Sequence, residues 1–318
     1  MKTSLMLYET YYGISKKVSD IFSKIIGNSK VLTISTKVED ISVYDNIFFI
    51  FSFHGYETAE KTKEYIKKVR DIIKDKKIIL IGVGLYKKDI ENYSKSICDI
   101  LSRKADYMEF IEGELRVNKL TDKDKEVLEK FLTTQNIKLM DMGKFKVKEC
   151  CDLAAKYREI IYTPSKKADD KIIDESISKF LLAHNTCALA TTDGENVRVT
   201  PIEYIYYKNS LYFITEGGLK FKGILQNSNI SVCIYEEFKG MNNIKGLQIT
   251  GKASVIDIGN EEYKEVLVKR NLKYENITKI PINMNMVKME ISKYEFLNSE
   301  FKSLGYDTNQ KLEIKSAD

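Results

Sequence analysis

The chain has 318 residues, of which 43% are hydrophobic and 31% charged, a balance typical of folded globular cores that excludes extensive disorder. This length favours two compact domains over one. The 51 lysines and arginines exceed the 46 acidic residues by only a small margin and are spread evenly, which argues against a nucleic-acid-binding protein.

The N-terminal stretch Met1 to Tyr8 has one lysine and a short apolar run, so it resembles neither a secretory signal nor a membrane span. We therefore expect a cytoplasmic protein with no membrane span. The five cysteines show no CxxC spacing and there are only two histidines, which argues against a metal site. Cys150 and Cys151 are interpreted as neighbours on a helix flank, with a redox-active pair as the alternative.

The first part of the chain alternates short apolar runs with amphipathic stretches, the pattern of a parallel sheet covered by helices. The expected strands are Thr3 to Tyr8, Val31 to Ser35, Asn46 to Phe53, Lys77 to Val83 and Tyr107 to Ile111. The expected helices are Ser15 to Ile26, Thr58 to Lys74, Lys88 to Arg103 and Thr121 to Thr134. These elements predict an α/β fold with a doubly wound, five-stranded parallel sheet.

From Asp141 to Lys171 the signal weakens into lysine-rich sequence, with an apolar helical patch around Cys151 to Ile161 and then Pro164. We place the domain boundary in this stretch. The predicted division is a first domain over 1–143, a helical linker over 144–168 and a second domain over 169–318.

The second domain begins with an expected helix over Asp169 to Leu182, after which the period becomes that of alternating strands. The expected strands are Thr186 to Thr192, Val197 to Tyr207, Ser210 to Thr215, Ile230 to Tyr235 and Lys245 to Ile256. Asp193-Gly194 and Lys208-Asn209 are tight turns between strand pairs. The pattern predicts a mainly antiparallel β barrel with flanking helices.

The first strand leads through a turn rich in hydroxyl groups directly into a helix. Such a turn presents free N–H groups and the positive end of the helix dipole to an anion. Gly13 lets the backbone approach a ligand, and Thr10 and Ser15 add hydroxyl donors. The alternative is that Ser15 is only a helix cap and Gly13 only a turn glycine. The place of the turn after the first strand favours a phosphate site formed by Thr10, Tyr11, Tyr12, Gly13, Ile14 and Ser15.

The T-x-x-G-x-S spacing of Thr10, Gly13 and Ser15 after an N-terminal strand, within five β/α units, resembles a flavodoxin. It is similar to the flavodoxin-type protoporphyrinogen oxidase group, whose loop also has a threonine three residues before the glycine. In such sheets the flavin lies beyond the carboxyl ends of the strands. The resemblance implies FMN contacts after the third and fourth strands, from Ser52, Phe53, His54, Gly55, Tyr56, Gly84 and Tyr86, with Tyr56 and Tyr86 as stacking candidates.

Two residues near this loop carry further expectations. Glu9 stands where that family often has a small hydroxyl residue, and its charge is expected to oppose a nearby phosphate. His54 is the one side chain of these loops that ordinarily titrates near neutrality, which makes it a candidate proton donor. The alternative for His54 is a plain hydrogen-bonding histidine, and the catalytic residues remain unassigned.

In the second domain, a hairpin from Cys187 to Pro201 is followed by a block from Leu211 to Val232. Both resemble the pyridoxamine 5'-phosphate oxidase-like split barrel. The resemblance implies FMN, with Arg198, Val199, Thr200 and Pro201 along the flavin and Thr215, Lys220 and Lys222 holding its phosphate. It also implies a homodimer through the barrel, with Met289 to Tyr306 as an extension that covers the interface.

Together the resemblances imply an FMN-dependent oxidoreductase or electron-transfer flavoprotein. The split-barrel flavin would reduce a small-molecule substrate, with the flavodoxin-like domain as electron partner. No G-x-G-x-x-G follows an expected strand, so NAD(P)H as reductant would dock directly at a flavin. The alternative is a non-enzymatic FMN- or haem-binding protein with a degenerate flavodoxin scaffold. The sequence indicates neither the substrate nor the order of electron transfer.

Overall fold

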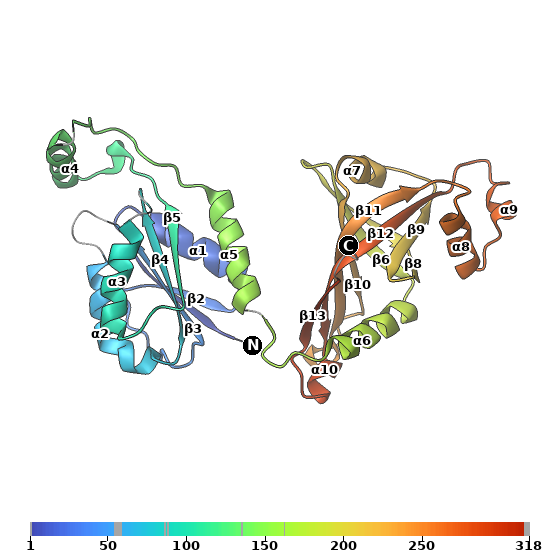
Figure 1. Cartoon of the computed structure of the whole chain (residues 1–318), viewed down its shortest axis with the longest axis horizontal. Helices are drawn as coiled ribbons and strands as arrows, with labels where there is room; N and C mark the ends of the chain where they lie inside the picture. Colours follow the sequence, from blue (N-terminus) through green and yellow to red (C-terminus); the bar gives the residue numbers. More distant parts are fainter. Residues whose placement is uncertain are drawn as a thin grey trace. The chain divides into compact units, whose positions relative to one another are not determined.

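The computed structural model describes residues 2–53, 59–85, 87, 89–134, 136–161 and 163–314. The chain divides into two compact units, Met1–Thr163 and Pro164–Asp318, called unit 1 and unit 2 below. Figure 1 shows unit 1 in blue to green and unit 2 in yellow-green to red.

Unit 1 is built on a five-stranded parallel sheet in the order β2-β1-β3-β4-β5. Its strands are β1 (Ser4–Glu9), β2 (Ser29–Thr33), β3 (Asn46–Ser52), β4 (Lys77–Gly84) and β5 (Tyr107–Glu112). Residues Ile47 to Phe51 of the central strand are fully buried, because helices cover both faces of the sheet. The predicted α/β sheet is confirmed.

Two helices pack on each face of this sheet (Figure 1). The four are α1 (Ile14–Ile26) and α5 (Val147–Ile161) on one face, and α2 (Glu60–Ile73) and α3 (Asp89–Leu101) on the other. Helix α1 buries Val18, Phe22 and Ile26, whose spacing of four residues places them on one side of the helix.

Helix α5 lies in the stretch that the sequence analysis assigns to a linker. Its Tyr157 ring contacts the rings of Phe22 and Phe48, with centroids 6.2 and 5.9 Å apart. Arg158 donates hydrogen bonds to the carbonyl oxygens of Ile25 and Ile26 at the end of α1. In the structure α5 therefore belongs to the core of unit 1, and the division between the units follows it. The residues of α5 in that core are Cys150, Ala154, Tyr157 and Ile161.

Between β5 and α5 the chain leaves the sheet in an excursion over residues 114–143, which contains η1 (Val117–Lys119) and α4 (Asp122–Thr134). Figure 1 shows α4 beyond the ends of β4 and β5. The base of the excursion is closed by a bridge between Leu115 and Met142. Gly143 has φ +69°, and a Cβ there would lie 2.5 Å from the Gly113 carbonyl oxygen, so this base requires glycine.

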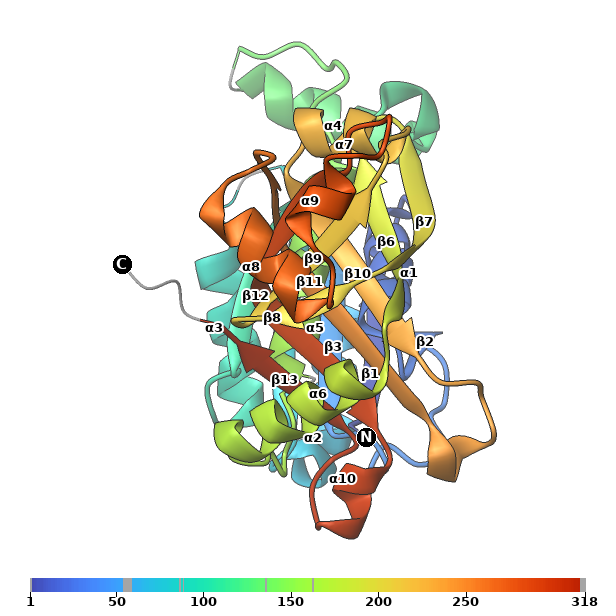
Figure 2. The same cartoon turned by 90° about the vertical axis from the view of Figure 1, so that its right-hand side faces the viewer.

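Unit 2 is built on an antiparallel sheet in the order β7-β6-β10-β11-β12-β9-β8, with β13 paired to β12, which curls into a half-barrel (Figure 1 and Figure 2). Its strands are β6 (Thr186–Thr192), β7 (Val197–Glu203), β8 (Ile205–Tyr207), β9 (Ser210–Thr215), β10 (Asn229–Tyr235), β11 (Lys245–Ile256), β12 (Asn285–Asn298) and β13 (Asn309–Glu313). This confirms the predicted, mainly antiparallel barrel with flanking helices.

Tyr204 divides the single strand that the sequence predicts over Val197 to Tyr207. Its buried hydroxyl donates to the carbonyl oxygen of Leu181 at 2.8 Å. The chain before Tyr204 pairs as β7 with β6, and the chain after it pairs as β8 with β9. The buried tyrosine thus marks the point where the chain crosses between the two ends of the sheet order.

The stretch Met289 to Tyr306, which the resemblance implies is an interface extension, begins within the long strand β12. This strand lies between β11 and β9, with Met289, Ile291 and Phe296 buried. Opposite Thr250 and Gly251 of β11, a register shift interrupts the alternation of buried and exposed residues along β12. β12 is therefore a core strand of the barrel.

Several helices flank the barrel of unit 2. They are α6 (Asp170–Ala183), α7 (Lys220–Gln226), α8 (Glu261–Lys269), α9 (Tyr274–Ile277), α10 (Glu300–Ser303) and the short η2 (Met241–Asn243). Helix α6 packs Ile173, Ile177 and Phe180 into the inner core. Among the residues that the structure describes, no helix is both long and apolar enough to span a lipid bilayer.

Candidate functional site

In unit 1 the loop between β1 and α1 brings the predicted residues Thr10 to Ser15 together. Gly13 occupies the cap position of α1 with φ +90°, a conformation that favours glycine. The Gly13 N–H donates to Thr10 Oγ1 at 2.9 Å. Because the threonine hydroxyl accepts this bond, its own hydrogen stays available to a ligand.

Ser15 lies in the first turn of α1 and is fully buried. Its Oγ has no hydrogen-bond partner among the described residues. A buried hydroxyl without a partner destabilises a fold by about 1–3 kcal/mol, which a ligand oxygen would relieve. With the positive end of the α1 dipole beside it, this donor fits a phosphate group.

Glu9, expected to oppose such a phosphate, is paired with another helix. Its buried carboxylate accepts hydrogen bonds through Oε2 from the N–H and the hydroxyl of Thr62, at 3.0 and 2.8 Å. Thr62 lies in the first turn of α2, so the carboxylate caps that helix and meets the positive end of its dipole. The other oxygen, Oε1, has no hydrogen-bond partner among the residues described.

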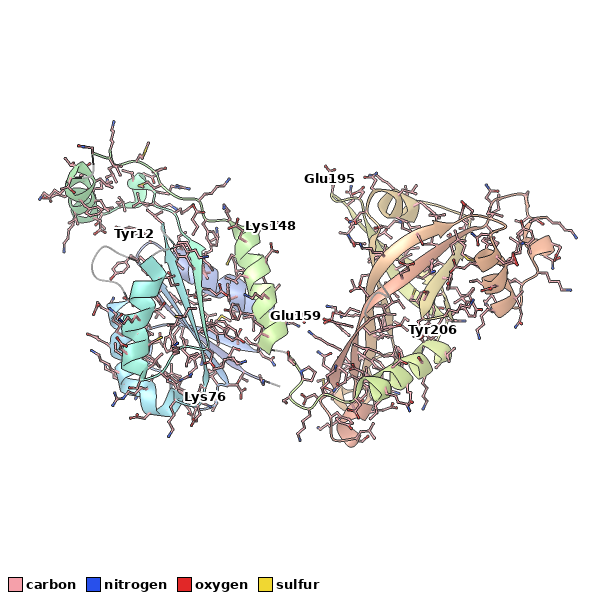
Figure 3. The ribbon with its side chains drawn as sticks, in the orientation of Figure 1. Tyr12, Lys76, Lys148, Glu159, Glu195 and Tyr206 are labelled. Atoms are coloured by element: carbon pink, nitrogen blue, oxygen red, sulfur yellow. The ribbon has the colours of Figure 1, made fainter. Side chains whose placement is uncertain are left out.

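Tyr12 connects the loop to the 114–143 excursion. Its hydroxyl donates to Asp124 Oδ2 and accepts from the Thr121 N–H at 3.4 Å. Figure 3 shows Tyr12 at the end of the sheet on the side of α4. Burial, and next the bond to Asp124, raise the pKa of Tyr12. Thr121 and Asp124 belong to the expected helix Thr121 to Thr134, and no local pattern in the sequence indicates their contact with Tyr12.

The loops after β3 and β4 are described only in part. His54, Gly55, Tyr56 and Tyr86 lie outside the described residues. Ser52 Oγ lies 3.5 Å from the Glu9 carbonyl oxygen, to which it donates. A Cβ on Gly84 would lie 2.2 Å from the Phe53 ring, so the absence of a side chain at Gly84 makes room for that ring. The resemblance to flavodoxins implies that Gly84 contacts FMN, and this stays a prediction.

In unit 2 a groove of about 270 Å³ lies between the β6–β7 hairpin and α7. Arg198 of β7 and Lys222 of α7 bring two cations to it from separate elements. Helix α7 lies close to β6 because Gly223 has no side chain, and a Cβ there would be 2.9 Å from Thr191 Cβ. The remaining lining residues are Thr192, Asp193, Asn196, Val197 and Leu219.

Asp193 is a groove residue that sequence reasoning treated only as part of a turn. Its Oδ2 lies 2.5 Å from Lys222 Nζ, and its Oδ1 accepts from the N–H groups of Glu195 and Asn196. Lys222 first, and then the Asn196 backbone, hold the pKa of Asp193 well below its usual range. The one sequence feature that could have indicated this groove residue is an aspartate in a hairpin turn. Its ionic partner, Lys222, is 29 residues away in sequence.

Thr215 and Lys220 meet each other at Gly217 and do not line the groove. Thr215 Oγ1 accepts from the Gly217 N–H at 3.4 Å, and the Lys220 ammonium donates to the Gly217 carbonyl oxygen. Both side chains are buried. The structure therefore places Arg198 and Lys222 on the groove. It places Thr215 at the end of β9 and Lys220 at the start of α7, where both contact Gly217.

The four predicted residues of β7 divide between the two faces of the strand. Arg198 and Thr200 alternate with Val199 and Pro201. Val199 exposes 60% of its surface, whereas Thr200 Oγ1 is buried without a hydrogen-bond partner among the described residues. Arg198 and Thr200 therefore share one face of the strand, on which the Thr200 hydroxyl is buried.

Cys150 and Cys151 both lie on α5 and differ in burial. Cys150 is buried in the core of unit 1, and burial raises the pKa of its thiol to about 12. A thiol with such a pKa is almost entirely protonated near neutral pH, and the thiolate is the nucleophilic form. This favours the interpretation as neighbours on a helix flank.

In comparisons with known proteins, a different family model matches each of the two units. The model of the flavodoxin domain family matches residues 5–138, and that of the pyridoxamine 5'-phosphate oxidase family matches residues 173–298. No curated protein matches the chain.

Solved structures that resemble the chain include three with low sequence identity. ChuZ of Campylobacter jejuni is 18% identical over 52% of this chain and 67% of its own, with a TM-score of 0.38. HutZ, the haem storage protein of Vibrio cholerae, is 14% identical over 37% of this chain and 89% of its own, with a TM-score of 0.33. A putative pyridoxamine 5'-phosphate oxidase of Listeria innocua is 21% identical over 40% and 99%, with a TM-score of 0.32. The family matches show that the chain contains a flavodoxin-like domain followed by a pyridoxamine 5'-phosphate oxidase-like domain.

Proposed function

We propose that the chain is a cytoplasmic FMN-dependent oxidoreductase or electron-transfer flavoprotein. The flavin of unit 2 reduces a small-molecule substrate, and unit 1 holds a second FMN as its electron partner. Domains of both matched families typically bind flavin, which supports this proposal in each unit.

The observation that carries the proposal is the pair of cations on the groove of unit 2. Arg198 and Lys222 approach it from a strand and a helix, as charge-assisted binding of a phosphate requires. The Ser15 hydroxyl at the start of α1, which has no hydrogen-bond partner among the described residues, supports the corresponding role for unit 1. Both units thus have polar groups suited to a phosphate.

When bound, FMN supplies the hydride and single-electron chemistry. Arg198 and Lys222 would hold the phosphate, and the buried Thr200 hydroxyl lies on the same face of β7 as Arg198. Val197 and Leu219 also line the groove, and their apolar side chains would contact the body of the ligand. NAD(P)H as reductant docks directly at the flavin.

A homodimer through unit 2 completes the proposal. β7 is an edge strand of the sheet, and Val197 and Val199 expose 77% and 60% of their surfaces on it. Exposed valines on an edge strand favour packing against another chain. Split barrels of the matched family often dimerise, which supports a second copy as the partner.

The test is a visible spectrum of the aerobically purified protein, followed by anaerobic titration with NADH and NADPH. We expect flavin absorbance that bleaches on reduction and returns when an acceptor from a panel of quinones and nitroaromatics is added. A protein that shows no flavin absorbance even after FMN addition, or that gains only a haem spectrum on addition of haem, contradicts the proposal.

A further inference from the structure

The two carboxylate oxygens of Asp193 differ in their shortest contacts, and the Asn196 side-chain amide donates to both, at 3.4 Å to Oδ1 and 3.3 Å to Oδ2. Oδ1 accepts the N–H groups of Glu195 and Asn196, at 3.0 and 2.7 Å, and so closes the turn between β6 and β7. Oδ2 holds the Lys222 ammonium at 2.5 Å. Figure 3 shows Glu195 at the tip of this hairpin, beside α7. Oδ2 is therefore the oxygen that pairs with the Lys222 cation of the groove.

The ion pair is asymmetric in its freedom to move. The Asp193 side chain is 7% exposed and fixed by the turn, whereas the Lys222 side chain is 55% exposed. An entering anion can therefore attract the ammonium but not displace the carboxylate. Because an ammonium has three N–H donors, Lys222 can bind a ligand oxygen while it remains on Asp193.

The charges that line the groove leave one net positive charge. Arg198 and Lys222 contribute two cations, and Asp193 removes one of them. Each negative charge on a ligand is attracted by the cations and repelled by the fixed carboxylate beside Lys222. The repulsion increases with every further charge that the ligand carries.

We propose that Asp193 is a charge filter, which makes this groove select a phosphomonoester over diphosphates and triphosphates. This inference rests on the proposed role of the groove as a phosphate site. A phosphomonoester carries roughly −1.5 to −2 charges near neutral pH. A diphosphate or triphosphate end carries more charge, so the carboxylate weakens its binding by a larger factor.

Asp193→Asn separates the two roles of the side chain. The asparagine oxygen can still accept the Glu195 and Asn196 N–H groups, while its NH₂ group cannot bind an ammonium. Glu195→Gln is the matched control, because it removes one negative charge from the same turn while Asp193 keeps Lys222. Lys222→Met gives the baseline for anions bound elsewhere on the chain.

The experiment titrates inorganic phosphate and pyrophosphate into the full chain and its variants by calorimetry. We expect Asp193→Asn to raise the preference for pyrophosphate over phosphate at least about threefold. Glu195→Gln should leave that preference within about twofold of the wild type. Lys222→Met should abolish the binding that responds to Asp193→Asn. Asp193→Ser, whose hydroxyl can also accept in such turns, should repeat the result if the asparagine variant fails to fold.

An unchanged preference in Asp193→Asn, or equal weakening of both anions, overturns the proposal. A parallel FMN titration separates this outcome from failure of the proposed function. If FMN binds but the preference does not respond, the charge filter alone is wrong. If the preference responds while FMN does not bind, the filter stands and the flavin assignment fails.

Discussion

The candidate phosphate sites of the two units differ in the groups that they offer. In unit 1 the nearby lysines have other partners, since Lys16 pairs with Asp20 at 2.6 Å and Lys17 lies over the Phe145 ring. The loop offers backbone N–H groups, the α1 dipole and the Ser15 hydroxyl. In unit 2 the groove relies on charged side chains instead. Ligand affinity at a site of fixed neutral donors should depend on the backbone geometry of the loop. Ligand affinity at a site of mobile charged side chains should depend on the charges of those side chains and on the salt concentration.

The largest effect should come from Gly13→Val. A β-branched residue at φ +90° is strained by about 1–3 kcal/mol, and relief of that strain would move the loop. We expect FMN affinity of unit 1 to fall about thirtyfold or more while unit 2 is unaffected, as measured by fluorescence quenching. Gly240→Val, also at positive φ but in unit 2, is the control, and an equal loss there would show that strain acts only on folding.

A second test compares the salt dependence of the two sites. Each site is measured without the other. Gly13→Val removes FMN binding by unit 1 and leaves that of unit 2, and Lys222→Met removes FMN binding by unit 2 and leaves that of unit 1. Raising ionic strength from about 50 to about 500 mM should weaken FMN binding to unit 2 about tenfold, because exposed charges are screened. Unit 1 should change less than about threefold. Equal sensitivity would remove the distinction between the sites.

Ser15→Ala tests the neutral donor of unit 1. We expect FMN affinity to fall about fivefold, because one hydrogen bond to the phosphate is lost. The melting temperature of the flavin-free protein should not fall, because the hydroxyl has no partner among the described residues. Ser19→Ala is the matched control: its hydroxyl donates to the Ser15 carbonyl oxygen at 2.9 Å, so its removal should lower stability but not affinity.

The smallest effect should come from Glu9→Gln. Because the Glu9 carboxylate caps α2, the substitution should leave the FMN affinity of unit 1 within about twofold of the wild-type value. It should lower stability by about 0.5–1 kcal/mol, because a negative charge is lost from the first turn of α2. Chemical denaturation with and without FMN measures both quantities. A marked gain in affinity would show instead that Glu9 repels the phosphate.

The sequence predicted the local elements well because their signals are local. The uniformly apolar run of β3 follows from burial on both faces of its sheet. The alternation of apolar and polar residues along β6 and β10 follows from burial on one face. The turn at Thr10 to Ser15 was recognisable for the same reason, since a strand, a glycine and a helix start are adjacent in the chain.

What the sequence did not predict depends on contacts between distant residues. Tyr12 and Asp124 are 112 positions apart, and no local pattern joins them. The buried alternation of β12 is interrupted by its register shift, which hides the period of a core strand. The pairing of Asp193 with Lys222 requires the close approach of α7 to β6 that Gly223 permits.

Flavin stoichiometry tests the central claim most directly. The full chain, saturated with FMN and freed of excess ligand, should hold about two flavins, one for each matched domain. Gly13→Val and Lys222→Met should each hold about one, and the double variant none. A wild-type value of one that neither single variant changes would contradict the account of two separate flavin sites.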